Sequence, residues 1–176
     1  VQKSTIQYLK DCYENGTPVT DAVHQTMCKL FYSYIVVGGM PDVVQTYVDT
    51  HDIAQVIARQ TEILELYRLD ISQYAQGNDK MKIRAIFDSI PAQLNEKNRR
   101  FILTAINPKG RQERYADSFN WLADAGVALP CYNVEKPQPP LRLNEKHNLF
   151  KLFMGDTGLL CAACMENVQF ALLNGE

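Results

Sequence analysis

Two cysteines separated by two residues are the pair in this sequence best suited to bind a metal or to exchange a disulfide. They form the segment Cys161-Ala162-Ala163-Cys164. A structural zinc site needs two further ligands, and the three histidines, His24, His51 and His147, stand singly in the chain. The cysteines follow the apolar pair Leu159-Leu160, so the pattern predicts that both pack on the buried face of a helix.

The triplet Asp156-Thr157-Gly158 is the active-site sequence of aspartic proteases, in which two carboxylates share one proton. Those enzymes consist almost entirely of strands and need a second triplet, whereas this sequence has one triplet in a helical setting. We therefore predict that Asp156 caps a helix beginning at Thr157, its carboxylate accepting hydrogen bonds from backbone N–H groups.

Gly38 and Gly39 lie between two apolar runs, where a glycine-rich loop could cradle phosphate groups. A Walker-type loop also needs a lysine near the helix start, and none is within reach. Pro41 in addition removes one amide donor. The segment is therefore predicted to be a corner between two helices. No catalytic, metal-binding or cofactor-binding residue is predicted in the sequence.

Helical periodicity dominates the first half of the chain. Thr20-Asp21 is a helix start signal, Gly38 is a stop signal, and Pro41 suits the first turn of the next helix. Arg59 and Arg68 each have an acidic residue three positions away, which predicts ion pairs on an exposed helix face. The predicted helices cover residues 3–14, 20–37, 41–50 and 52–74.

The second half has the element order of a winged helix, in which helices precede a β-hairpin. Its predicted elements are a helix from residue 81 that closes near 91–94, a short apolar element over 101–106, a helix over 111–125, and strands over 127–134 and 149–154.

These patterns together predict a mainly α fold with one small β-hairpin. Residues 1–78 are predicted to form a helical segment. Residues 79–176 are predicted to form a winged-helix-like module, with its wing at about 133–148 and a short helix at its end. The 46% apolar and 22% charged residues are ordinary for a soluble globular protein.

The sequence also bears on location. No run of about 18 apolar residues is present, so we predict no membrane span. The five cysteines are odd in number and scattered, which favours reduced thiols and a cytoplasmic protein. The chain starts at Val1 without a signal region or initiator methionine, and we expect it to be part of a longer chain.

Charge is unevenly distributed along the chain. Residues 1–79 carry five basic and ten acidic side chains, whereas residues 80–114 carry nine basic and three acidic ones. A basic segment of this kind attracts polyanions, although a solvated surface of mixed charge accounts for it equally well. The predicted nucleic-acid contacts, which precede or begin the candidate recognition helix, are Lys97, Arg99, Arg100, Lys109, Arg111 and Arg114.

Several stretches resemble the domain of unknown function that follows the P-loop core in bacterial and archaeal AAA-type ATP-binding proteins. They are YIVVGGMPDVV (34–44), LYRLDISQYA (66–75), IRAIFDSIPAQLNEKNRRF (83–101), YADSFNWLADAGV (115–127) and FKLFMGDTGLL (150–160). The resemblance implies an ATPase domain upstream, where ATP and Mg²⁺ would bind, and a restriction-endonuclease-like segment downstream. Neither is present in these 176 residues, so no enzymatic activity is expected of them.

Two hypotheses for the function follow. In the first, the chain is a non-catalytic accessory module that couples the ATPase core to the nuclease-like segment, with Trp121 at a protein interface. In the second, the winged helix binds duplex DNA weakly, with little sequence preference, through the six basic residues. We favour the first, because Asp117 and Asp124 on the outer stripe of the 111–125 helix would face phosphates in a groove.

Overall fold

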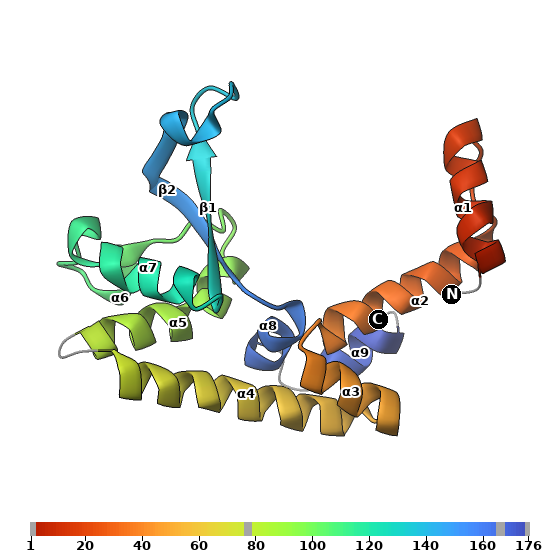
Figure 1. Ribbon diagram of the computed structural model, residues 1–176, viewed down its shortest axis with the longest axis horizontal. Helices are drawn as coiled ribbons and strands as arrows, with labels where there is room; N and C mark the ends of the chain where they lie inside the picture. Colours follow the sequence, from red (N-terminus) through yellow and green to blue (C-terminus); the bar gives the residue numbers. More distant parts are fainter. Residues whose placement is uncertain (1–2, 76–78, 165–167, 175–176) are drawn as a thin grey trace.

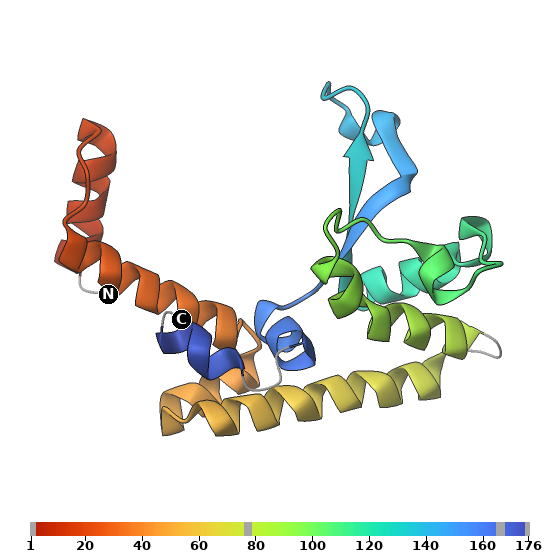
Figure 2. The same ribbon diagram turned by 180° about the vertical axis from the view of Figure 1, so that it is seen from behind.

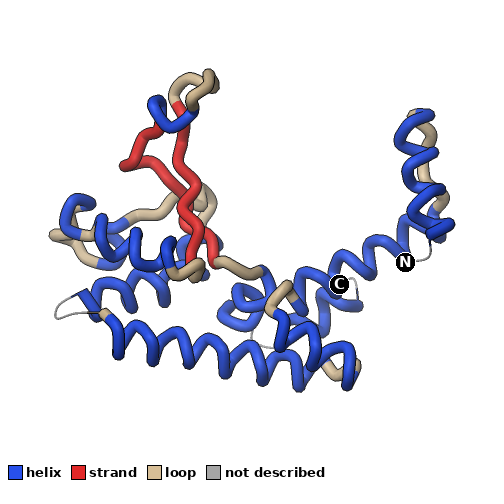
Figure 3. Tube along the Cα trace, viewed as in Figure 1, coloured by secondary structure: helices blue, strands red, loops and turns tan. Residues whose placement is uncertain are grey.

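The fold is mainly helical, with one two-stranded antiparallel sheet, as predicted (Figure 3). The computed structural model describes residues 3–75, 79–164 and 168–174. Figure 1 shows the long helix α4 (Ile53–Tyr74) along one side of the molecule. The β-hairpin projects from the body at one end, and α1 (Lys3–Asn15) stands apart at the other end. No helix among the described residues is long and apolar enough to cross a membrane.

Four helices make up the N-terminal part, close to their predicted limits. Gly38 ends the second at φ +74°, and Pro41 occupies the first turn of the third, as the local signals predict. Asp52 caps the fourth, its carboxylate accepting the N–H of Ala54 at 2.8 Å. The helices are α1 (Lys3–Asn15), α2 (Asp21–Val37), α3 (Pro41–Thr50) and α4 (Ile53–Tyr74).

The predicted ion pairs on α4 are confirmed. Arg59 pairs with Glu62 and Arg68 with Glu65, both at 2.6 Å. Each arginine also reaches a second carboxylate from another helix, Asp42 for Arg59 and Asp88 for Arg68. Because these groups are exposed to solvent, water and salt screen the pairs, which therefore contribute little to stability.

The second part has the predicted order of helices followed by a hairpin. Its elements are α5 (Asp79–Asn95), α6 (Leu103–Ile106), η1 (Gln112–Arg114), α7 (Ala116–Asp124), β1 (Ala128–Val134), η2 (Leu141–Asn144) and β2 (Glu145–Met154). The α-helices α5, α6 and α7 followed by β1 and β2 give the order expected of a winged-helix-like module.

The prediction of one continuous helix over residues 111–125 is wrong at its start. The hydrogen bonds there span three residues, since Tyr115 donates its N–H to the Gln112 carbonyl at 2.9 Å, and α7 begins only at Ala116. Long-range contacts hold this turn: Lys82 Nζ donates to the Arg114 carbonyl at 3.2 Å, and Asn107 donates to the Tyr115 hydroxyl at 3.0 Å. Helical periodicity alone carries no signal of these partners.

The hairpin is longer than predicted because pairing continues into the expected wing. Asn133 pairs with Lys146 and Val134 with Glu145, so the connection spans residues 135–144. The register then slips, since Tyr132 pairs with Phe150. His147, Asn148 and Leu149 therefore form a bulge on β2, which re-aims side chains away from the ladder.

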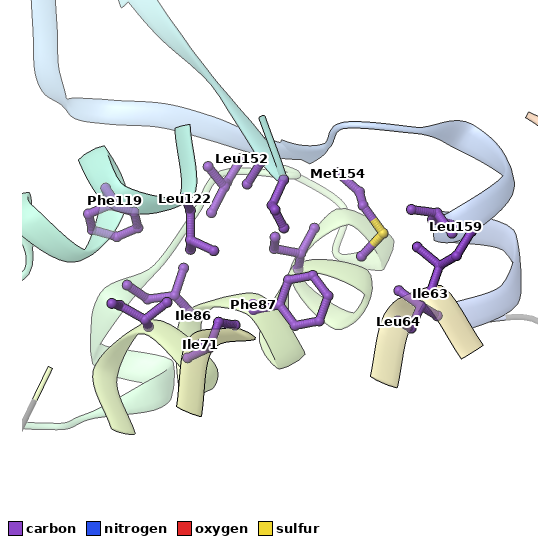
Figure 4. Close-up of a cluster of buried hydrophobic side chains, with 14 of the residues drawn as sticks. Ile63, Leu64, Ile71, Ile86, Phe87, Phe119, Leu122, Leu152, Met154 and Leu159 are labelled. Carbon is purple, nitrogen blue, oxygen red and sulfur yellow. The ribbon is translucent and has the colours of Figure 1, made fainter. Parts of the chain in front are cut away.

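One apolar core joins both parts of the chain. Ile71 of α4, Ile86 and Phe87 of α5, Leu122 of α7 and Leu152 of β2 all belong to one cluster of buried side chains (Figure 4). The boundary predicted at residue 78 falls within residues 76–78, which lie outside the described residues. The division into two domains therefore stays a prediction.

Two helices follow the hairpin, where one was predicted. They are α8 (Thr157–Cys164) and α9 (Val168–Asn174). Both return to the N-terminal part, because α8 contacts α2 and α4 and α9 contacts α2 (Figures 1 and 2).

Candidate functional site

Asp156 and the glycine corner, which are far apart in the sequence, meet in the structure. The Asp156 carboxylate accepts the N–H of Leu159 at 2.9 Å, which confirms its predicted role as a helix cap. Its other oxygen accepts the N–H of Gly39 at 2.7 Å, a contact that the sequence did not predict. One carboxylate therefore joins the start of α8 to the corner between α2 and α3.

Gln60 of α4 completes this contact region, which we call the α2–α8 junction (Gly38, Gly39, Gln60, Asp156, Gly158). The Gln60 side chain is buried and donates to the carbonyls of Val36 and Val37, at 2.8 and 3.1 Å. These carbonyls belong to the last turn of α2, which has no partners within the helix. Gln60 therefore satisfies acceptors that burial would otherwise leave unpaired.

The junction has structural rather than catalytic chemistry. The Gly39 N–H, which a phosphate would need, already binds an internal carboxylate. Cys161, in the same helix as the cap, donates its S–H to the Ile35 carbonyl at 3.5 Å, and burial raises its pKa to about 11. A thiol with that pKa stays protonated and is a poor nucleophile at neutral pH.

The prediction that both cysteines of the pair are packed holds only for Cys161. Cys164 is exposed and turns its thiol to the Leu160 carbonyl at 2.9 Å, because α8 buries one side against α2 and α4. In the part of the chain that the structure describes, no three His, Cys, Asp or Glu side chains are placed to hold a metal ion.

The six basic residues predicted to contact nucleic acid are all exposed, and five of them lie in two loops while the sixth, Arg114, lies in a short 3-10 helix. Lys97, Arg99 and Arg100 are in the loop between α5 and α6, and Lys109 and Arg111 are in the turn between α6 and η1; Arg114 ends η1. None forms an ion pair with a described residue. Arg100 donates only to the Asn148 carbonyl, at 3.1 Å.

Two shallow hollows lie beside the β2 bulge. One, of about 350 Å³, is lined by Arg100, Gly110 and Gln112, among others. The other, of about 340 Å³, is lined by Tyr132 and His147, among others. Gln112 and Asn148 line both hollows, and the Gln112 amide donates to the carbonyl of His147, which lines the second. We call the two together the hairpin groove.

Trp121, the predicted interface residue, is half-buried on α7 and packs against the core. Its helix contacts α5 and β1. The structure therefore gives Trp121 a packing role within the chain, and a role at a protein interface stays a prediction.

A more exposed apolar surface lies on α2. Leu30, Phe31 and Tyr34 are within about one helical turn and are 47%, 58% and 59% exposed. We call them the α2 patch. In the sequence these residues lie in the helix predicted over 20–37, and nothing local marked them as exposed.

Sequence reasoning also missed Tyr132, His147 and Asn148 of the hairpin groove. Tyr132 and His147 lie edge to face, with ring centroids 5.1 Å apart. The only local signal was that 144–148, the sequence NEKHN around His147, is too polar to continue the apolar strand beginning at Leu149.

A family model described as a domain of unknown function, DUF8612, matches residues 28–169. The match runs from the middle of α2 into α9 and includes the α2–α8 junction and the hairpin groove. No curated protein and no solved structure matches the chain.

Proposed function

The chain belongs to the DUF8612 family, and we propose that it is a non-catalytic accessory module which docks other domains of a longer AAA-type ATPase. The sequence resemblance supplies this setting, with an ATPase core upstream and a nuclease-like segment downstream. The module would hold the two in a fixed relation, and ATP and Mg²⁺ would bind in the core.

The observation that carries this proposal is the exposed apolar surface of the N-terminal helices. Besides the α2 patch, Ile6 and Tyr13 of α1 are 45% and 89% exposed. Figures 1 and 2 show α1 projecting from the start of α2, and no other described element lies beside it. Contiguous exposed apolar side chains on a soluble protein mark contact surfaces for other proteins.

The chemistry of the α2–α8 junction supports a non-catalytic role. Its carboxylate is engaged by two backbone N–H groups, and its neighbouring thiol is held protonated. Both groups stabilise contacts between helices, and neither is presented to a substrate.

We expect the double variant Phe31→Ser, Tyr34→Ser to weaken binding to the separately produced ATPase core by at least about thirtyfold, because exposed aromatic anchors dominate interface energies at roughly 2 kcal/mol or more. Isothermal titration calorimetry measures the affinity. Leu69→Ser is the matched control, since Leu69 is 60% exposed on α4, away from the α2 patch. No heat of binding with the parent chain, or equal losses with the control, would contradict the proposal. Trp121→Ala tests the predicted interface residue in the same titration.

A second candidate function is weak binding of nucleic acid through the six basic residues, favoured by their exposure and by their lack of described ion-pair partners. If about four of them reach phosphates of duplex DNA together, the slope of log affinity against log salt is roughly −3 to −4.

Replacing Arg111 and Arg114 by alanine is expected to weaken duplex binding and to flatten that slope by about 2, because each lost phosphate contact contributes about 0.9 to it. Asp117→Lys is expected to strengthen binding, since it removes a repelled charge from α7. Fluorescence anisotropy at several salt concentrations measures both effects. If the chain is an accessory module that does not bind nucleic acid, no duplex binding is measured near physiological salt, and none of the three substitutions changes that result.

A further inference from the structure

We propose that the hairpin groove binds single-stranded nucleic acid, with a base lying against His147 and Tyr132 and a neighbouring phosphate at Arg100. This inference rests on the second candidate function, because it assigns a ligand class and a site to the basic surface.

The bulge on β2 creates the groove. In a regular hairpin His147 and Asn148 would each face a partner on β1, but the register slips between Tyr132 and Asn133 and leaves them unpaired. Bulges of this kind re-aim side chains and occur often beside functional sites. Here the bulge turns His147 and Asn148 toward the start of α7, where they line the hollow with Asn120.

The two hollows fit successive units of a polymer better than one compact molecule. Each measures about 350 Å³ or less, near the lower limit for small-molecule pockets. They lie side by side, because Gln112, Phe119, Asn148 and Phe150 line both. A chain of repeating units can place one unit in each.

Charge distinguishes the two hollows. Arg100 lines the first, and Gly110, which also lines it, stands between Lys109 and Arg111 in the chain. The second hollow contains one charged side chain, the carboxylate of Glu113, which would repel a phosphate. A phosphate therefore belongs at Arg100 and an uncharged base in the second hollow.

The second hollow offers what an unstacked base requires. His147 is exposed, and its ring meets Tyr132 edge to face, which provides an aromatic surface. Asn120 and Asn148 supply amide groups that donate to and accept from base edges. Positively charged grooves with aromatic side chains are the common design of proteins that bind single strands.

A duplex fits this surface less well. Reading of a major groove would bring the outer face of α7 to the phosphates, and that face carries Asp117 and Asp124. Bases in a duplex are also stacked and paired, so they cannot enter the second hollow.

The test is fluorescence anisotropy with three labelled probes of about 12 nucleotides: oligothymidylate, oligouridylate and a blunt DNA duplex. We expect both single strands to bind at least about tenfold more tightly than the duplex, and a preference between them distinguishes DNA from RNA. His147→Ala should weaken single-strand binding about tenfold, and His147→Phe should restore it, because stacking needs a ring. Arg100→Ala should weaken it about fivefold and reduce the magnitude of the salt slope by about 0.7.

Lys10→Ala is the control, since Lys10 is an exposed cation on α1, remote from the groove (Figure 1). Equal affinity for single strands and duplex, or the same small effect for His147→Ala and Lys10→Ala, overturns the groove proposal but leaves charge-driven duplex binding intact. Absence of binding to all three probes overturns both. The proposal of a protein-docking module stands or falls separately, by the calorimetric titration.

Discussion

Replacing Gly158 by alanine is expected to lower the free energy of unfolding by about 3 kcal/mol, the largest effect of any single substitution considered for this chain. A Cβ at this position would lie 2.5 Å from both the Val37 carbonyl oxygen and the Gln60 side-chain nitrogen. The carbonyl is backbone at the end of α2 and cannot rotate away. The side chain of Gln60 is buried and already holds two hydrogen bonds, so it cannot move without breaking them.

The physical cause is the close approach of α8 to the end of α2. Because Gly158 has no side chain, α8 packs directly on the last turn of α2 while Gln60 of α4 bonds that turn from beside it. An added methyl group forces the helices apart, which weakens the Gln60 bonds together with the contact of Asp156 with Gly39.

Urea denaturation followed by circular dichroism measures this loss. Gly39→Ala is the matched control, since a Cβ there meets only an Asp156 oxygen at 3.6 Å, an ordinary van der Waals distance. We expect the control to change stability by less than about 1 kcal/mol. Equal stability of the two variants would show that α8 does not pack on α2 as described.

Asp156→Ala is expected to destabilise the chain by about 2.5 kcal/mol. Loss of the helix cap costs about 1 kcal/mol. Loss of the hydrogen bond that a second backbone N–H donates to the charged carboxylate costs about 1.5 kcal/mol more. The two bonds concerned are those from the N–H groups of Leu159 and Gly39.

Asp52→Ala separates the two contributions. Asp52 also caps a helix, but its bonds, from Ala54 and Gln55, are all local to the start of α4. Asp52→Ala should therefore cost less stability than Asp156→Ala, because it removes only a local cap. Thermal or urea unfolding of both variants provides the comparison. If Asp156→Ala costs no more than Asp52→Ala, the bond to Gly39 contributes nothing to stability.

The sequence by itself determined the elements whose signals are local. Apolar residues at helical spacing, with Gly38 as a stop and Pro41 as a start, predicted α1 to α4 closely, because helix ends depend on capping groups within a few residues. The same holds for the cap at Asp156, whose Leu159 partner is three residues away. The apolar runs over 127–134 and 149–154, in the element order of a winged helix, likewise predicted the hairpin.

Tertiary structure decided how these elements meet. The Gly39 N–H lies 117 residues from its partner Asp156, and no local pattern links the two. In the same way, the contacts of Lys82 and Asn107 with the turn before α7 replaced the predicted first helical turn by η1.

The candidate sites depend on the same long-range order. The six basic residues were identified from their charge alone, but their placement in two loops and in η1 followed from where α5, α6 and η1 begin and end. His147 and Tyr132 lie edge to face beside a slip in strand register, and no local sequence pattern marks where that slip occurs. The α2 patch is exposed because α8 and α9 cover other sides of α2. The apolar pattern of a helix does not show which of its apolar residues other elements will cover.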